Sequence, residues 1–216
     1  MFIENIFRII QNYYIDFLRG TWVTIKLAVI AVFFGTILGS LIAVAKISKR
    51  PILAKVGSVY VEVFRGIPLL LQLWVIYLLT STTLGKTAAV CLALFLNSAA
   101  YVAEIIRSGI ESVDKGQMEA ARSLGLSRWF SMRKIIFPQA IKNILPALGN
   151  EFVTVIKETS LASAFYIGDL MTIKNTITTS TYLSLEPYII IGLIYLFLTF
   201  TISKLVKLLE VKLNHD

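Results

Sequence analysis

The sequence predicts an all-α membrane protein with five transmembrane helices, and three observations support this prediction. Of its 216 residues, 56% are hydrophobic and 16% are charged, whereas soluble domains are about 45–50% apolar and about 25% charged. The mean hydropathy is +0.76, and several stretches approach the roughly 20 apolar residues that a spanning helix needs. Lysine and arginine are also distributed unevenly between the connecting segments, which sets the orientation. We therefore expect one polytopic membrane domain over residues 1–216.

The first element, residues 1–20, is predicted to be a helix that lies along the membrane surface. It lacks the basic start and the unbroken apolar core of a cleavable signal peptide. Its apolar side chains recur at helical spacing, so one face of the helix can enter the lipid headgroup region. These side chains are Ile3, Ile6, Phe7, Ile10, Tyr14 and Phe17.

Four uncharged apolar stretches predict transmembrane helices directly. They are residues 27–45, 67–84, 87–103 and 187–203. The first contains Gly35 and Gly39, a GxxxG pair that lets another helix approach closely. Gly66 and Pro68 predict a break where the second span enters the membrane. The last span begins with Pro187, whose missing N–H costs little in the first turn of a helix.

A fifth span is predicted over residues 143–156, which cross the membrane only if their helix continues through Lys157 and Glu158. With this crossing, one side of the membrane carries 15 Lys and Arg residues and the other carries five, with Lys157 inside the span. With four spans the counts are 12 and eight, or 12 and nine when Lys157 is included. The positive-inside rule therefore favours five spans, an outer N-terminus and a cytoplasmic C-terminus.

The composition disfavours several other classes of protein. The net charge of +8 does not indicate nucleic-acid binding, because excess Lys and Arg in a membrane protein usually marks cytoplasmic loops. The one cysteine, Cys91, lies in an apolar run, so an internal disulfide is excluded. The one histidine, His215, is the penultimate residue, and no metal site is predicted. A membrane-bound enzyme would need a nucleophile or an acid–base pair, and only Glu151 and Glu158 qualify.

The polar insertion after the third predicted span predicts two short helices around a glycine turn on the basic, inner side. The run EAARSL consists of good helix formers, and Gly125 can end that helix in the left-handed conformation. Ser127 can cap a second helix, and Pro138 lies beyond the core of that helix. Ala120 and Ala121 form a small-residue face that can seat deeply in another protein's groove. A surface hairpin without a partner fits the pattern equally well.

This insertion, residues 104–142, also carries a spaced pattern that resembles the EAA loop of type I permease subunits in ATP-binding cassette importers. The pattern consists of Glu119, Ala120, Ala121, Gly125, Ile135, Phe137 and Pro138. Phe137 stands where the family usually has leucine, which keeps the position apolar. Four further blocks are similar to the permeases for polar amino acids: YVEVFRGIPLLLQL, NSAAYVAEIIRSGI, LPALGNEF and KETSLAS. The resemblance extends from about residue 21 to the C-terminus.

The resemblance implies a multi-pass permease subunit in the bacterial cell (inner) membrane. Its implied partners are a second permease subunit, identical or different, two cytoplasmic ATPase subunits and an extracytoplasmic substrate-binding protein. ATP and magnesium would be bound by the ATPases, whose closure would turn the permease from inward-facing to outward-facing. The ATPases would engage the loop through Glu119, Ala120, Ala121, Gly125 and Pro138.

The chain itself is not predicted to bind ATP or any other cofactor. Residues 85–87 read Gly-Lys-Thr, as at the end of a P-loop, but the pattern needs a glycine where Thr80 stands. The tripeptide also falls in a predicted outer turn, away from cytoplasmic ATP.

Three charged residues, Glu151, Lys157 and Glu158, lie in or directly after the fifth predicted span. On one helix Glu151 and Glu158 share a face with Thr154 between them, and Lys157 lies about 100° from Glu158. Ionisable groups at membrane depth mark substrate routes by default, so we favour a position along the translocation path. The alternatives are a solvated helix end and a structural ion pair, which can join two subunits.

Two acids and one base per subunit favour a cationic amino acid such as arginine, lysine or histidine, with glutamine or glutamate as the nearest rivals. Gln72 and Asn97, lone amides in the second and third spans, add polar contacts to the substrate or form interhelical hydrogen bonds instead. The alternative function is an ion-coupled secondary transporter without an ATPase. That class often carries inverted repeats, none of which is visible here, and it would leave the EAA loop without a role.

Overall fold

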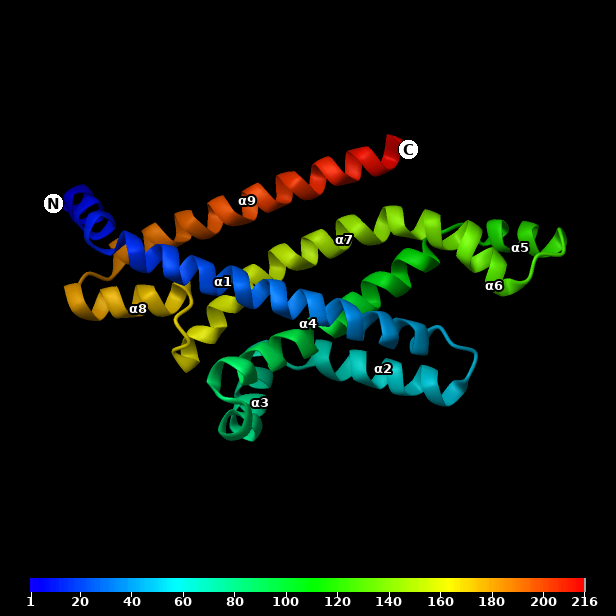
Figure 1. The fold of residues 1–216 in the computed structure, drawn as a ribbon, viewed down its shortest axis with the longest axis horizontal. Helices are drawn as coiled ribbons and strands as arrows, with labels where there is room; N and C mark the ends of the chain where they lie inside the picture. The colour runs from blue at the N-terminus through cyan, green and yellow to red at the C-terminus, as the bar shows by residue number, and fades with distance from the viewer. Residues whose placement is uncertain (216) are drawn as a thin grey trace.

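The structure, a computed structural model, describes residues 1–215 and is helical in all of its regular secondary structure (Figure 1). Asp216 and the side chains of Asn214 and His215 lie outside the described part, so nothing tests the prediction for His215. The elements, with η1 a π-helix and η2 a 3₁₀-helix, are α1 (Phe2–Lys46), α2 (Pro51–Gly66), α3 (Leu69–Leu84), α4 (Lys86–Glu111), α5 (Lys115–Ser123), α6 (Arg128–Ser131), η1 (Met132–Ile136), α7 (Phe137–Glu158), η2 (Thr159–Phe165), α8 (Leu170–Thr181) and α9 (Leu185–His215).

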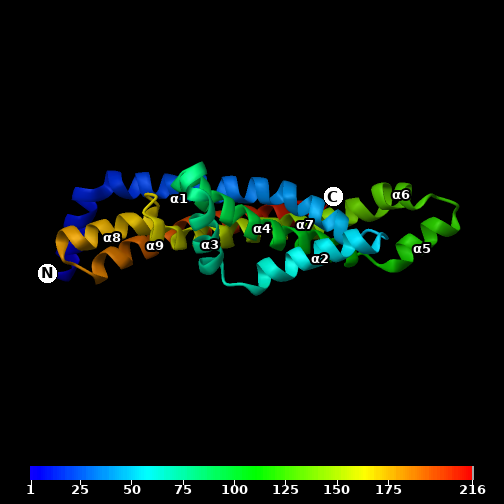
Figure 2. The same ribbon diagram turned by 90° about the horizontal axis from the view of Figure 1, so that it is seen from below.

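Three helices, α1, α4 and α9, are long and apolar enough to cross a membrane. They contain three of the four apolar stretches that the sequence predicts as spans. The remaining stretch forms α3, which is bent by 107° relative to α2 at the predicted break. Figures 1 and 2 show α3 lying across the long axis of the molecule. The α2–α3 pair is therefore a broken span or a re-entrant segment, and the bend lies at the break that Gly66 and Pro68 predict.

The predicted surface helix over residues 1–20 is not a separate element, because α1 continues without interruption from Phe2 to Lys46. Figures 1 and 2 show its first turns leaning away from the axis of the rest of α1. The helix is continuous because the junction, residues 19–22, carries no proline and includes one glycine that packs against α8. A Cβ on Gly20 would lie 2.7 Å from Ile173 and 3.0 Å from the backbone of Leu170.

The fifth predicted span lies inside α7, which has 22 residues and does continue through Lys157 to Glu158. At 1.5 Å per residue this helix is about 33 Å long, close to the roughly 30 Å hydrocarbon thickness of a bilayer. Its composition is less apolar than that of α1, α4 and α9, and it is outside the set of clear membrane-spanning helices. The crossing itself remains a prediction.

The core of the molecule forms where α4 packs against α1, α2, α3 and α7. The most extensive helix contact joins α1 to α4, and it includes the predicted GxxxG pair. A Cβ on Gly39 would lie 2.7 Å from the carbonyl oxygen of Ala99 and 2.8 Å from Val102, and one on Gly35 would lie 3.1 Å from Ser98. The two glycines therefore allow the α1–α4 contact, and they hold the α4 residues that reach toward α7 in place.

Candidate functional site

The acid inside the fifth predicted span is buried between two helices. Glu151 lies on α7 and is 7% exposed, and its Oε1 accepts a hydrogen bond from the hydroxyl of Ser98 on α4 at 3.0 Å. Asn97, the residue before Ser98, is 3% exposed on the same helix. The structure therefore places two of the predicted polar residues at or beside the α4–α7 contact, in the middle of the helical core.

The structure separates Lys157 from Glu151. Lys157 is exposed near the end of α7, whereas Thr154 and Glu158 are half-buried. Of the charged groups in the described part of the chain, none lies within 4 Å of Lys157 or Glu158 as an ion pair. Lys157 is exposed in the single chain, and the solvated helix end, the ion pair between subunits and the translocation path all remain predictions for it.

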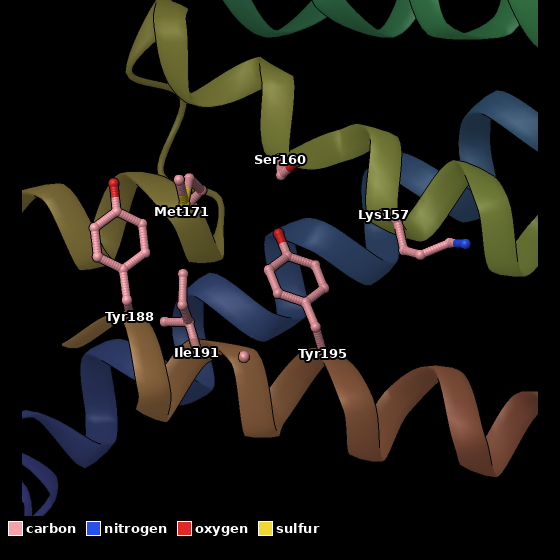
Figure 3. Close-up of a pocket in the computed structure, with 7 residues that line it drawn as sticks. Lys157, Ser160, Met171, Tyr188, Ile191 and Tyr195 are labelled. Atoms are coloured by element: carbon pink, nitrogen blue, oxygen red, sulfur yellow. The ribbon is translucent and has the colours of Figure 1, made fainter. Parts of the chain in front are cut away.

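Lys157 instead borders a pocket of about 320 Å³ between α7, η2, α8 and α9. Figure 3 shows the hydroxyl groups of Ser160 and Tyr195 facing this space, with the Lys157 side chain extending away from Met171. The lining is completed by Tyr188, Ile191 and Gly192. The pocket is large enough for a small polar molecule, and it contains none of the other predicted site residues.

Gln72 lies at the break between α2 and α3. Its amide nitrogen donates to the carbonyl oxygens of Phe64 and Ile67, both at 2.7 Å. These carbonyls lose their helical partners because the chain turns by 107° around Pro68, which has no N–H to donate. Gln72 therefore stabilises the break, in keeping with the hydrogen-bonding alternative, and a contact with substrate remains a prediction.

The polar insertion forms a helical hairpin that projects from one end of the molecule (Figure 1). Gly125 adopts a φ of +80° after α5, as predicted, in the left-handed region that favours glycine. Ser127 caps α6 by accepting a hydrogen bond from the backbone N–H of Phe130 at 3.2 Å. The guanidinium group of Arg122 donates to the carbonyl of Leu126 at 2.7 Å and closes the turn.

The two alanines of the hairpin do not share one exposed face. Ala121 is buried inside the hairpin, whereas Glu119 and Ala120 are exposed. The tip instead exposes two large apolar side chains, Leu124 at 81% and Trp129 at 72%. Sequence reasoning missed these two residues, and the available signal was an apolar run, LGLSRWF, around the glycine of a polar loop.

The second helix of the hairpin is not a short element that ends before Pro138. α6, η1 and α7 follow one another without a break from Arg128 to Glu158. Pro138 has no N–H and its ring crowds the preceding turn, and the π-helical segment η1, which directly precedes α7, widens that turn. The second arm of the hairpin is therefore joined to the helix that carries Glu151 without an intervening loop.

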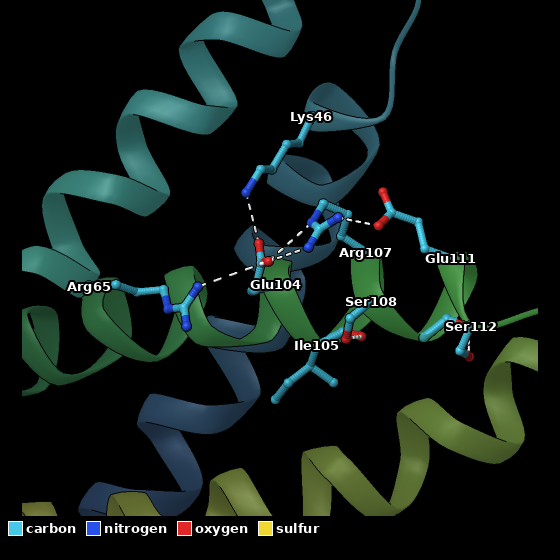
Figure 4. Close-up of polar contacts among 9 residues, drawn as sticks. Lys46, Arg65, Glu104, Ile105, Arg107, Ser108, Glu111 and Ser112 are labelled. Atoms are coloured by element: carbon cyan, nitrogen blue, oxygen red, sulfur yellow. Dashed lines mark hydrogen bonds and ion pairs between the residues drawn. The ribbon is translucent and has the colours of Figure 1, made fainter.

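A second charged cluster, which sequence reasoning missed, joins three helices. Glu104 on α4 accepts hydrogen bonds from Nζ of Lys46 at 2.7 Å and from Nε of Arg107 at 3.1 Å. Arg65, near the end of α2, lies 4.0 Å away, and Arg107 also contacts Glu111 (Figure 4). The signal in the sequence that could have indicated this cluster is an acid directly after an apolar span, together with two connecting segments rich in cations that are predicted to lie on the same side of the membrane. The cluster holds the ends of α1 and α2 against α4.

Comparisons with known proteins agree on one family. Residues 35–215 match the family model described as "Binding-protein-dependent transport system inner membrane component". The chain is 42% identical over 199 residues to a putative glutamine transport system permease protein, GlnP, from Rickettsia bellii, covering 90% of this chain and 91% of the relative. It is 42% identical over 203 residues to the arginine transport system permease protein ArtQ from Bacillus subtilis, covering 92% and 93%.

Two solved structures show the same fold. The first is described as an amino acid ABC transporter with histidines, and it superposes with a TM-score of 0.89 at 46% identity over 93% of this chain and 95% of that chain. The second, an inward-facing form of the MetNI methionine ABC transporter, has a TM-score of 0.78 at 22% identity over 91% and 95%. The second likeness supports the fold alone.

Proposed function

The chain belongs to the family of inner membrane components of binding-protein-dependent transport systems, and from this premise we propose that it is the permease subunit of an ATP-driven amino acid importer. The observation that carries the proposal is the family match over residues 35–215. The chain works with a second permease subunit, two cytoplasmic ATPase subunits and an extracytoplasmic substrate-binding protein. The ATPases, not this chain, hold ATP and magnesium.

The proposed topology has five spans, with α7 as the fifth. The N-terminus lies outside, and the α5–α6 hairpin and the C-terminus lie in the cytoplasm. Two observations support this arrangement: α7 is long enough to cross, at 22 residues, and the positive-inside bias, which is 15 against five with this crossing and weaker without it, favours its crossing. The family membership and this topology together leave the ion-coupled secondary transporter without a supporting observation.

The hairpin is the proposed contact with the ATPase. Its tip exposes Leu124 and Trp129 beside the exposed Glu119 and Ala120. Large apolar side chains, with Trp foremost, are enriched among the residues that dominate binding at protein interfaces. Because α6, η1 and α7 follow one another without a loop, closure of the ATPases moves the α7 helix and tips the spans from inward-facing to outward-facing.

The proposed cargo is a polar, basic amino acid. Glu151 and Glu158 lie on one face of α7, and Glu151 is buried against α4. Together with Thr154, Asn97, Gln72 and Lys157, these residues form the proposed substrate-contacting set. The relatives named for arginine and glutamine transport support an amino acid as the substrate class. A buried acid without an ion-pair partner among the side chains that the structure describes favours a cationic side chain over a neutral one.

Co-purification tests the proposed function. Tagged protein is extracted from its native membrane in a mild detergent, and the recovery of a nucleotide-binding subunit is compared between wild type and variants. The wild type is expected to retain the ATPase, and Glu119→Arg to lose most of it, because the reversed charge faces the partner. Glu210→Arg reverses another exposed acid, on α9, and is expected to retain the ATPase. Absence of an ATPase from the wild-type sample, or equal recovery with Glu119→Arg, would contradict the proposal.

A further inference from the structure

A pocket of about 700 Å³ opens where α1 meets the junction of α3 and α4, away from the polar residues described above. Its walls are mostly apolar, and two lysines and one threonine are the polar exceptions. The lining residues are Lys26, Ile30, Phe34, Leu84, Gly85, Lys86, Thr87, Ala88, Cys91, Leu92 and Phe95.

Two columns of side chains form the walls of this pocket. On α1 the lining residues Lys26, Ile30 and Phe34 follow one another at intervals of four, so they lie on one face of the helix. On α4 the residues Cys91 and Phe95 continue the column that Thr87 begins. Eight residues of helix rise about 12 Å, so the walls extend well into the apolar layer. The rings of Phe34 and Phe95 meet at 6.4 Å and close the far end.

The two lysines lie at the mouth of the pocket. Lys26 directly precedes the uncharged stretch 27–45, and Lys86 directly precedes the uncharged stretch 87–103. Both therefore lie where an apolar span meets the polar boundary of the membrane, on the same side. No carboxylate lines this pocket, and the ion pairs found among residues 1–215 include neither lysine. Two exposed cations without an ion-pair partner among residues 1–215 therefore lie above an apolar groove.

We propose that this pocket binds one anionic phospholipid. The phosphate lies between the ammonium groups of Lys26 and Lys86, and an acyl chain lies between the two columns and ends against Phe34 and Phe95. In a membrane an apolar groove alone gains little from an acyl chain, because the surrounding lipid is equally apolar. Selectivity must therefore come from the lysines, and it favours an anionic headgroup over a zwitterionic one.

The Gly-Lys-Thr tripeptide at residues 85–87 has a physical role in this assignment, although it is not part of a P-loop. Lys86 and Thr87 present an ammonium and a hydroxyl group at the mouth, which suits the phosphate of a lipid. The walls below them are apolar and offer no hydrogen-bonding groups for a nucleotide base. A second copy of this chain is the competing occupant, and the experiment distinguishes it from lipid.

Photo-crosslinking tests the proposal with the permease purified together with the subunits that accompany it and placed in lipid nanodiscs. Trace phosphatidylglycerol or phosphatidylcholine, each with the same diazirine-bearing acyl chain, is irradiated and the labelled peptides are identified by mass spectrometry. We expect phosphatidylglycerol to label peptides of residues 27–37 and 88–95 roughly tenfold more than phosphatidylcholine does. Inorganic phosphate at millimolar concentration is expected to leave this labelling unchanged, since the acyl chain contributes to binding.

The variant Lys26→Gln/Lys86→Gln is expected to reduce phosphatidylglycerol labelling of the pocket to the phosphatidylcholine level. Labelling of α9, whose exposed apolar side chains include Leu193, Leu196 and Phe197, should not change and shows that the variant is folded. The matched control Lys49→Gln/Lys55→Gln removes two exposed lysines elsewhere and should label as the wild type does.

Three results would overturn the proposal. Equal labelling of the pocket by both lipids would show that the lysines confer no selectivity. Loss of labelling with inorganic phosphate would indicate a site for a free anion rather than for a lipid. The third result is that lipid labels other surfaces but not the pocket, because a second permease copy covers it. This result would assign the face to contact between subunits.

Discussion

At the scale of single residues, Glu151 lies in a different environment from that of the charged residues near the end of its helix. It is almost fully buried and accepts one hydrogen bond, from Ser98, whereas Lys157 is exposed. A carboxylate has about four acceptor sites, so one hydroxyl group leaves most of that capacity open to a cationic substrate. Helical spacing predicted that Glu151 and Glu158 share a face, but it held no information on the partner that α4 supplies.

The variant Glu151→Gln is expected to lower arginine uptake by roughly tenfold, because the loss of one favourable charge contact corresponds to about 1.4 kcal/mol. Glutamine uptake should change much less. The amide keeps the size of the side chain and can still accept a hydrogen bond from Ser98, so the amount of folded protein should be unchanged. Radiolabelled uptake into proteoliposomes that contain the whole complex measures both substrates. Unchanged arginine uptake would refute the role of this acid.

Glu104 has a structural role that thermal unfolding can test. The change Glu104→Gln removes the negative charge shared by Lys46, Arg107 and Arg65. Because the cluster is partly exposed, we expect a loss of about 1–2 kcal/mol in unfolding free energy. The control Glu111→Gln affects an acid that is 57% exposed and should cost less than about 0.5 kcal/mol. Equal effects of the two variants in detergent solution would show that the cluster does not join the helices.

At the scale of elements, two features organise the molecule: the tight α1–α4 contact and the loop-free connection of α6 through η1 to α7. The α1–α4 contact requires small residues, and the GxxxG pair in the sequence predicts it. This continuity of α6, η1 and α7 does not follow from the sequence, because Pro138 usually interrupts a helix and the π-helical segment that accommodates it depends on the packing around it. A hairpin joined to α7 by helix rather than by a loop is what a coupling element needs.

The variant Gly39→Ala tests the α1–α4 contact. Its Cβ would lie 2.7 Å from the carbonyl oxygen of Ala99, and a backbone atom cannot move without separating the helices. We expect a loss of about 1–3 kcal/mol in unfolding free energy, measured by thermal unfolding. Gly192→Ala is the matched control, since nothing lies within 4 Å of the added atom, and it should be neutral or slightly stabilising. A neutral Gly39→Ala would show that the helices are further apart than described.

At the scale of the whole molecule, composition and apolar runs were sufficient to predict an all-helical membrane protein and the position of four apolar stretches. The bend of 107° between α2 and α3 could not be predicted, because its size depends on how Gln72 binds the carbonyls freed at the break. The Glu104 cluster could not be predicted either. Lys46 and Arg65 lie 58 and 39 residues from Glu104 in the sequence, and in the sequence all of these residues look like ordinary charges at a membrane boundary. Contacts between distant helices leave no periodic pattern in the sequence.

The central claim is that transport through this chain is driven by ATP, and the most direct measurement is arginine uptake into proteoliposomes with the membrane potential clamped. The liposomes contain the permease with its ATPase subunits, and the substrate-binding protein is supplied on the outer side. We predict uptake that requires ATP with magnesium on the cytoplasmic side and that persists when ion gradients are collapsed. Uptake that proceeds without ATP and follows a proton or sodium gradient would contradict the account and assign the buried acid to ion coupling.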